Sequence, residues 1–127
     1  MSFFSHLLVP CPIIQIDDIV NTGDSMKLCI EQLKASGASK VYAWATHGVF
    51  GSHSEAASSS DKLQKCDGLE YLLISNTVNS TEPLPPKIKR LNVAPLMAEA
   101  IARSLYNQSI TGILNLDSMG KAGQDKK

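Results

Sequence analysis

The sequence carries no net charge and has no long hydrophobic run. Its 12 Lys and Arg residues balance 12 Asp and Glu residues, so bulk electrostatics give no support for binding to nucleic acid or to an acidic surface. The apolar stretch before Gln15 has no basic start, contains Pro10 and Pro12, and is too short to span a bilayer. We therefore expect a soluble protein with neither a membrane nor a nucleic acid as its partner.

Cysteine is scarce in this chain. Cys11, Cys29 and Cys66 are odd in number and lack the spacing of a metal site. This pattern argues against a disulfide framework and favours a reduced, cytoplasmic setting. The 127 residues allow one domain with a modest core.

Short apolar strand patterns alternate with helical patterns along the chain. Strands are expected at residues 13–17, 40–46, 69–74 and 88–93. Helices are expected from Ser25, as the N-cap, to Gly37, weakly around residues 55–65, and again from Pro95. The buried face of the last helix is expected at Met97, Ala100, Ile101 and Leu105.

This order of elements predicts an α/β fold. We expect a three-layer, doubly wound, mostly parallel sheet of about four strands, joined by right-handed crossovers. The expected organisation is an atypical extension at residues 1–12, a domain at residues 13–116 and a flexible Gly- and Lys-rich tail at residues 117–127.

The segment IDDIVNTGDS, residues 16–25, carries most of the chemical information. Asp17 and Asp18 end a predicted strand, and a Thr-Gly turn leads directly into a helix. Ligands of parallel sheets bind at the carboxyl ends of the strands. Carboxylates there can accept hydrogen bonds from sugar hydroxyls, and the amides of a turn and a helix start can donate to phosphate. The segment therefore predicts a site for a ribose and its phosphate.

Two further polar residues follow neighbouring strands. His47 comes after the second predicted strand, and we expect it to hold that strand end in place. Thr77 follows the third strand at the same edge of the sheet and is a candidate to approach the ribose.

The segment IDDIVNTGDS resembles the phosphoribosyl diphosphate-binding motif shared by type I phosphoribosyltransferases and ribose-phosphate diphosphokinases. Three later segments resemble the C-terminal domain of the diphosphokinases in order and spacing: KVYAWATHGVF at residues 40–50, LLISNTV at residues 72–78 and KIKRLNVAPLMAEAIARSLYNQSITGIL at residues 87–114. The resemblance runs from about Ile13 to Leu114. It implies a phosphoribosyltransferase-like fold that is half of a two-domain architecture.

The resemblance also implies an activity, because these diphosphokinases transfer a diphosphoryl group from Mg-ATP to the 1-hydroxyl of ribose 5-phosphate. The product, phosphoribosyl diphosphate, serves nucleotide biosynthesis. Asp17 and Asp18 would hold the ribose hydroxyls directly or through magnesium, an ion that prefers oxygen ligands. The 5-phosphate would lie in a loop formed by Asn21, Thr22, Gly23, Asp24 and Ser25.

Two regions need separate interpretation. Ser109 and Thr111 match the family segment at an allosteric phosphate and ADP site between subunits, although a short surface turn is an equally good interpretation.

Within the phosphate loop, the family usually has a carboxylate where this chain has Asn21 and a small uncharged residue where it has Asp24. The negative charge of Asp24 is expected to disfavour phosphate, because like charges at short range repel.

The resemblance places the ATP-binding elements in an N-terminal half that precedes the matched segments. We therefore expect ATP to be supplied by such a half or by a partner subunit, in a homo- or hetero-oligomer, and little or no kinase activity from this chain alone. One alternative is a non-catalytic regulatory subunit of a diphosphokinase assembly, which the exchanges at Asn21 and Asp24 favour. Another is a free-standing type I phosphoribosyltransferase, which would require a hood segment to hold a base.

Overall fold

The computed structural model describes residues 10–50, 56–80 and 83–114. The chain divides into two compact units, residues 1–91 and residues 92–127. No helix of the described ranges combines the length and the apolar character needed to cross a membrane. The expected tail at residues 117–127, and residues 1–9 of the expected extension, lie outside the described residues.

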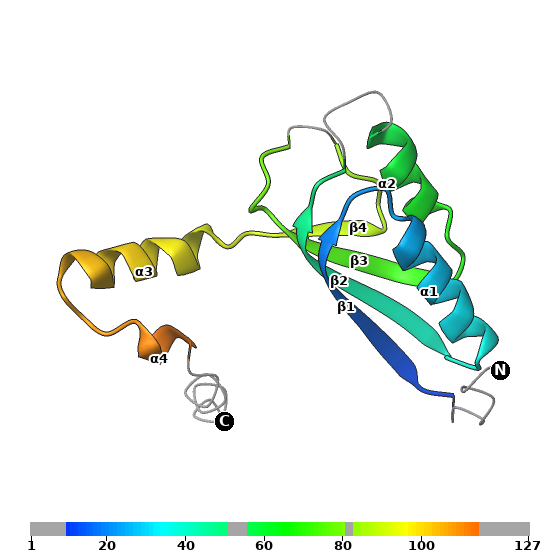
Figure 1. Ribbon diagram of the computed structural model, residues 1–127, viewed down its shortest axis with the longest axis horizontal. Helices are drawn as coiled ribbons and strands as arrows, with labels where there is room; N and C mark the ends of the chain where they lie inside the picture. Colours follow the sequence, from blue (N-terminus) through cyan, green and yellow to red (C-terminus); the bar gives the residue numbers. More distant parts are fainter. Residues whose placement is uncertain (1–9, 51–55, 81–82, 115–127) are drawn as a thin grey trace, which may run out of the picture. The chain divides into compact units, whose positions relative to one another are not determined.

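The first unit is built on a four-stranded sheet whose strands are all parallel, in the order β1-β2-β3-β4 (Figure 1). The strands are β1 (Pro12–Val20), β2 (Lys40–Gly48), β3 (Leu69–Ser75) and β4 (Ile88–Leu91). β-branched and aromatic residues are concentrated in β1 and β2, where such side chains pack well on a pleated surface, whereas the apolar residues of β3 are mostly leucines. The predicted α/β class with a four-stranded parallel sheet is confirmed.

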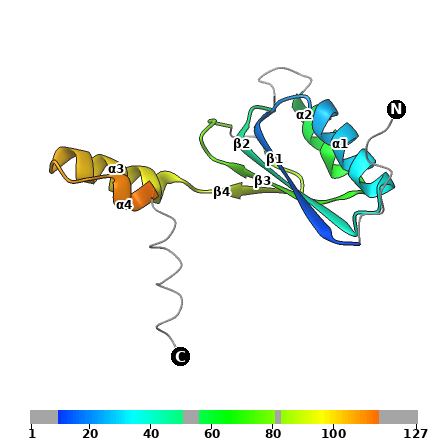
Figure 2. The ribbon, with the colours of Figure 1, turned by 60° about the horizontal axis from the view of Figure 1, so that its bottom comes forward.

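Two helices of this unit lie on the same face of the sheet, as Figures 1 and 2 both show. They are α1 (Asp24–Ala35) and α2 (Ala56–Gln64). The described residues of this unit thus form two layers where three were expected. The reason is that the third expected helix belongs to the second unit.

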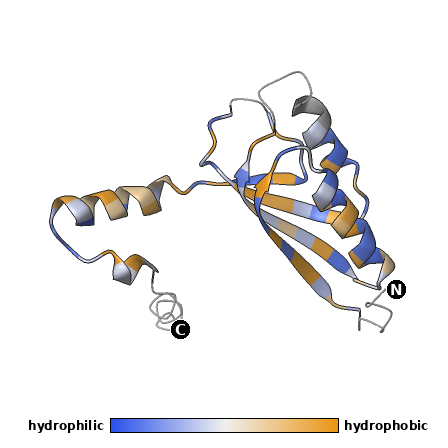
Figure 3. Cartoon of the chain, in the orientation of Figure 1, coloured by the Kyte–Doolittle hydropathy of each residue, from blue (hydrophilic) through white to orange (hydrophobic). Residues whose placement is uncertain are grey.

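The core lies between the sheet and these two helices. Its largest fully buried side chains come from both helices and from two central strands: Met26, Ile30, Val41, Leu63, Leu69, Leu72 and Ile74. Because side chains alternate along a strand, the residues between the buried ones point to the other face. On that face Ile14 is 65% exposed and Ile16 is 75% exposed. The apolar colouring along β1 is visible in Figure 3.

The second unit contains α3 (Ala94–Leu105) and the short α4 (Thr111–Leu114). Pro95 lies in the first turn of α3, as expected from its fixed φ angle. No residue of α3 is buried, so the expected buried face of Met97, Ala100, Ile101 and Leu105 is wrong. The periodicity was correct, but within this unit the other described helix has four residues and cannot cover an apolar face.

Candidate functional site

The loop between β1 and α1 turns at a glycine. Gly23 has a φ of 75°, in the left-handed region that other residues rarely adopt. A Cβ at this position would lie 3.0 Å from Cγ of Leu63 in α2. Glycine therefore serves both the backbone conformation and the close approach of α2. The prediction that Ser25 is the N-cap is wrong, because the turn at Gly23 already brings Asp24 into the helix.

Asp17 and Asp18 lie near the carboxyl end of β1, as predicted. The amide of Asp18 donates to Oδ1 of Asp17 at 2.9 Å, and the amide of Ile19 donates to Oδ1 of Asp18 at 2.7 Å. Asp17 is half-buried and Asp18 is exposed. The second oxygen of each carboxylate has no hydrogen-bond partner among the described residues. Each carboxylate can therefore accept a further hydrogen bond or bind a cation.

The loop presents backbone donors at the start of α1. The first amides of any helix have no partner inside the helix, and the macrodipole makes this end favourable for negative charge. The first turn closes with the amide of Lys27 donating to the carbonyl of Gly23 at 2.9 Å. The side chains of Asn21 and Ser25 are exposed, and neither has a hydrogen-bond partner within the described part of the chain.

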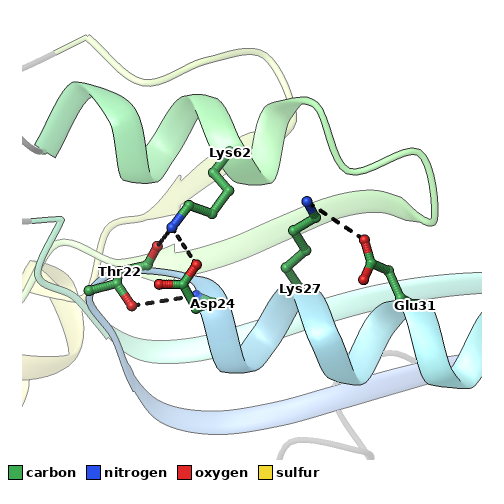
Figure 4. A network of polar contacts seen from close by, with 5 residues as sticks. All are labelled: Thr22, Asp24, Lys27, Glu31 and Lys62. Atoms are coloured by element: carbon green, nitrogen blue, oxygen red, sulfur yellow. Dashed lines mark hydrogen bonds and ion pairs between the residues drawn. The ribbon is translucent and has the colours of Figure 1, made fainter.

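Lys62 of α2 reaches into this loop, as Figure 4 shows. Its Nζ donates to the carbonyl oxygen of Thr22 at 3.2 Å and forms an ion pair with Oδ1 of Asp24. The charge of Asp24 is thus balanced by a neighbouring cation, which opposes the repulsion expected from the sequence. Lys62 was not predicted: it lies 38 residues from Asp24 in the chain, and no local pattern connects the two.

The ion pair also changes the acidity of Asp24. The hydrogen bond from Lys62 is the main reason that the pKa of the Asp24 carboxyl lies below its ordinary value, and the Thr22 side chain lowers that pKa further. Because the pKa of Asp24 is lower in the folded state, the ion pair with Lys62 stabilises the fold at neutral pH, where the carboxylate is charged. This stabilisation is lost as the pH falls through the pKa of Asp24, below about pH 4.

A second polar cluster lies at the carboxyl ends of β2 and β3. Nδ1 of His47 and Oγ1 of Thr77 are 2.7 Å apart. The hydroxyl of Ser75, a buried residue, donates to the carbonyl oxygen of Thr46 at 2.6 Å and is 2.7 Å from the Thr77 hydroxyl. These contacts join the end of β2 to the segment after β3, which agrees with a structural role for His47. The approach of Thr77 to a ribose stays a prediction.

Ser109 and Thr111 lie together in the second unit. The amide of Thr111 donates to Oγ of Ser109 at 3.2 Å, next to the start of α4. The carbonyl oxygen of Ser109 accepts from Nη1 of Arg103 at 3.1 Å. This arrangement is a capped turn, which the alternative interpretation of the sequence anticipated. The allosteric role of the two residues stays a prediction.

Comparison with known proteins identifies the family. The family model described as the phosphoribosyl synthetase-associated domain matches residues 11–115. The chain belongs to this family. The resemblance to ribose-phosphate diphosphokinases, also called pyrophosphokinases, is thereby confirmed.

Ribose-phosphate pyrophosphokinases of other organisms are similar over most of this chain. The ribose-phosphate pyrophosphokinase of Wolinella succinogenes is 36% identical over 101 residues, a match that covers 80% of this chain and 30% of that protein. Ribose-phosphate pyrophosphokinase A of Dictyostelium discoideum is 36% identical over 104 residues, covering 79% of this chain and 30% of that protein.

A solved structure agrees with the fold. The phosphoribosylpyrophosphate synthetase of Mycobacterium smegmatis is similar with a TM-score of 0.66 and 29% identity, covering 76% of this chain and 30% of that chain. This chain therefore spans about 30% of the length of the relatives that it matches.

Proposed function

We propose that this chain supplies the ribose 5-phosphate site of a ribose-phosphate diphosphokinase. The observation that carries the proposal is the position of the segment IDDIVNTGDS in a chain of this family. Its two carboxylates lie near the end of a parallel strand, and its loop opens into the first turn of α1. Carboxylates and helix-start amides side by side match the two halves of a sugar phosphate.

Each group in the loop has a distinct role in this proposal. The second oxygens of Asp17 and Asp18 accept hydrogen bonds from the ribose hydroxyls, and the amides after Asn21 donate to the 5-phosphate. The residues Thr22, Gly23, Asp24 and Ser25 shape that loop and position its donors.

Magnesium fits the same carboxylates. Among the described residues, no group of three or more His, Cys, Asp or Glu side chains is placed to hold a metal. Mg²⁺ commonly binds through one or two carboxylates and takes its other ligands from water and substrate phosphates. Asp17 or Asp18 can supply such a carboxylate oxygen, and a bound Mg²⁺ would neutralise phosphate charge.

Binding of ribose 5-phosphate tests this proposal directly. In the presence of Mg²⁺ we expect calorimetric titration to detect binding of ribose 5-phosphate, with ribose at least about tenfold weaker, because ribose lacks the acceptor for the loop amides. Replacing Asp18 with Asn should weaken binding of ribose 5-phosphate about tenfold, the cost of losing one charge-assisted hydrogen bond.

Asp67 offers a matched control for this substitution. It is exposed and precedes β3, so it lies at the opposite edge of the parallel sheet. The Asp67→Asn variant should bind ribose 5-phosphate like the original chain. Equal affinities for ribose and ribose 5-phosphate, or equal losses in the Asp18 and Asp67 variants, would contradict the proposed site.

We further propose that diphosphoryl transfer requires an ATP-binding part supplied by an N-terminal half or by a partner subunit, in a cytoplasmic homo- or hetero-oligomer. The relatives' length supports this, since the match covers 30% of them. The purified chain, mixed with Mg-ATP and ribose 5-phosphate, should release no AMP above a blank without protein. Sustained AMP release that depends on ribose 5-phosphate would contradict this.

A second candidate function is that of a non-catalytic regulatory subunit. The ion pair of Asp24 with Lys62 favours it, because a cation that could serve a phosphate is engaged by the chain itself. Co-purification of the chain with a catalytic family member, together with a change in the activity of that member, would support this function.

A further inference from the structure

Lys62 connects the phosphate loop to a helix outside the sequence motif. Its Nζ bonds to the Thr22 carbonyl and to the Asp24 carboxylate, while its neighbour Leu63 packs against Gly23. Lys62 thus holds both ends of the segment 22–24, and the next residue of α2, Leu63, packs against its middle residue. Lys27, one turn into α1, instead pairs with Glu31 at 3.7 Å on the helix surface (Figure 4).

We propose that Lys62 is an exchangeable counter-ion of this loop, which pairs with Asp24 when the site is free and with the phosphate of ribose 5-phosphate when that ligand binds. The inference rests on the proposed function, since it assigns a selectivity device to the same site. Asp24 then acts as an internal anion that competes with the ligand.

The geometry of the pair allows such an exchange. A lysine ammonium has three N–H donors, and the described contacts of Lys62 use two of them. The side chain of Asp24 is 67% exposed, so its carboxylate can turn into solvent without losing a buried environment. Lys62 can keep its bond to Thr22 and remain at the loop during the exchange.

The chemistry favours the phosphate over the carboxylate. A phosphate monoester carries more negative charge at neutral pH and offers three acceptor oxygens. The amides at the start of α1 also add donors that can act on a phosphate in the loop. A phosphorylated sugar would therefore displace the Asp24 carboxylate from Lys62, whereas a neutral sugar could not.

A double-mutant cycle separates exchange from simple repulsion. Asp24→Asn should tighten binding of ribose 5-phosphate about tenfold, because the competing ion pair is gone. Lys62→Met, which keeps the length of the side chain, should weaken it about tenfold in the original chain. In the Asp24→Asn background the same Lys62 substitution should weaken binding of ribose 5-phosphate about a hundredfold. In that background Lys62 need not first break an ion pair with Asp24, so its whole interaction with the phosphate is lost.

The remaining measurements keep the cycle specific. Lys40→Met is the matched control, because Lys40 begins β2 at the opposite edge of the sheet and pairs with Glu70 at 4.0 Å. It should leave the affinity for ribose 5-phosphate unchanged, and the affinity for ribose should be the same in all variants.

The pKa of Asp24 is lowered by Lys62, Thr22 and Lys27. A carboxyl-carbon NMR titration should therefore show that the pKa of Asp24 rises in the Lys62→Met variant. The pKa should also rise when ribose 5-phosphate saturates the original chain.

The possible outcomes have different consequences. An equal cost of Lys62→Met in both backgrounds would overturn the exchange and leave the proposed function standing. A parallel loss of affinity for ribose and ribose 5-phosphate would assign Lys62 a purely structural role and would also overturn it. Absence of ribose 5-phosphate binding in every protein of the cycle would overturn both the exchange and the proposed function.

Discussion

Replacing Leu72 with alanine is expected to lower the free energy of unfolding of the first unit by about 2–5 kcal/mol. Leu72 is fully buried in β3, between Ala43 of β2 and Ile88 of β4. Ala43 is too small to fill the space, so the substitution removes buried apolar surface and leaves a cavity as well. Small single-core domains have little stability in reserve, so a sizeable unfolded population is expected without denaturant. Chemical denaturation followed by circular dichroism measures the effect.

The exposed face of the same sheet supplies the control. Ile16 is 75% exposed on β1, and Ile16→Ala should change the free energy of unfolding by no more than about 0.5 kcal/mol. A loss as large as that of Leu72→Ala would mean that this face is covered in solution. Equal small losses in both variants would instead contradict the assignment of the core to the helix-covered face.

The sequence was sufficient to locate the sheet and the candidate loop. The apolar runs that form the strands and the glycine turn that follows β1 are local features of the sequence. The N-cap of α1 was misplaced by two residues, at Ser25 in place of Gly23, because the left-handed turn at Gly23 rather than a side chain sets the start of the helix.

What the sequence could not predict depends on contacts between distant segments. The pairing of Lys62 with Asp24 arises only when α2 packs beside the loop, which brings together residues 38 positions apart. The exposure of α3 likewise depends on what packs against it, whereas its apolar periodicity is local. The burial of the Gln15 side-chain oxygen also depends on such contacts, although Gln15 lies inside the apolar run predicted as the first strand.

Gln15→Met is expected to raise the free energy of unfolding by about 1–3 kcal/mol. Gln15 lies in β1 opposite the buried Ala43, and its Oε1 atom is buried without a hydrogen-bond partner among the described residues. A buried polar atom that loses its bonds to water and gains none in the fold destabilises the folded state. Methionine has a similar length and shape without that polar group, so the destabilising contribution disappears while the packing is kept.

Gln64 provides a control of the same residue type with the opposite expectation. Its Oε1 accepts a hydrogen bond from the amide of Lys87 at 2.9 Å, so Gln64→Met would leave that amide without its partner and should lower the free energy of unfolding by about 1 kcal/mol. The opposite signs separate the effect of an unpaired oxygen from a general benefit of methionine. If Gln15→Met destabilises the chain as Gln64→Met does, then Oε1 of Gln15 has a hydrogen-bond partner in solution, and the expectation of an unpaired buried oxygen is contradicted.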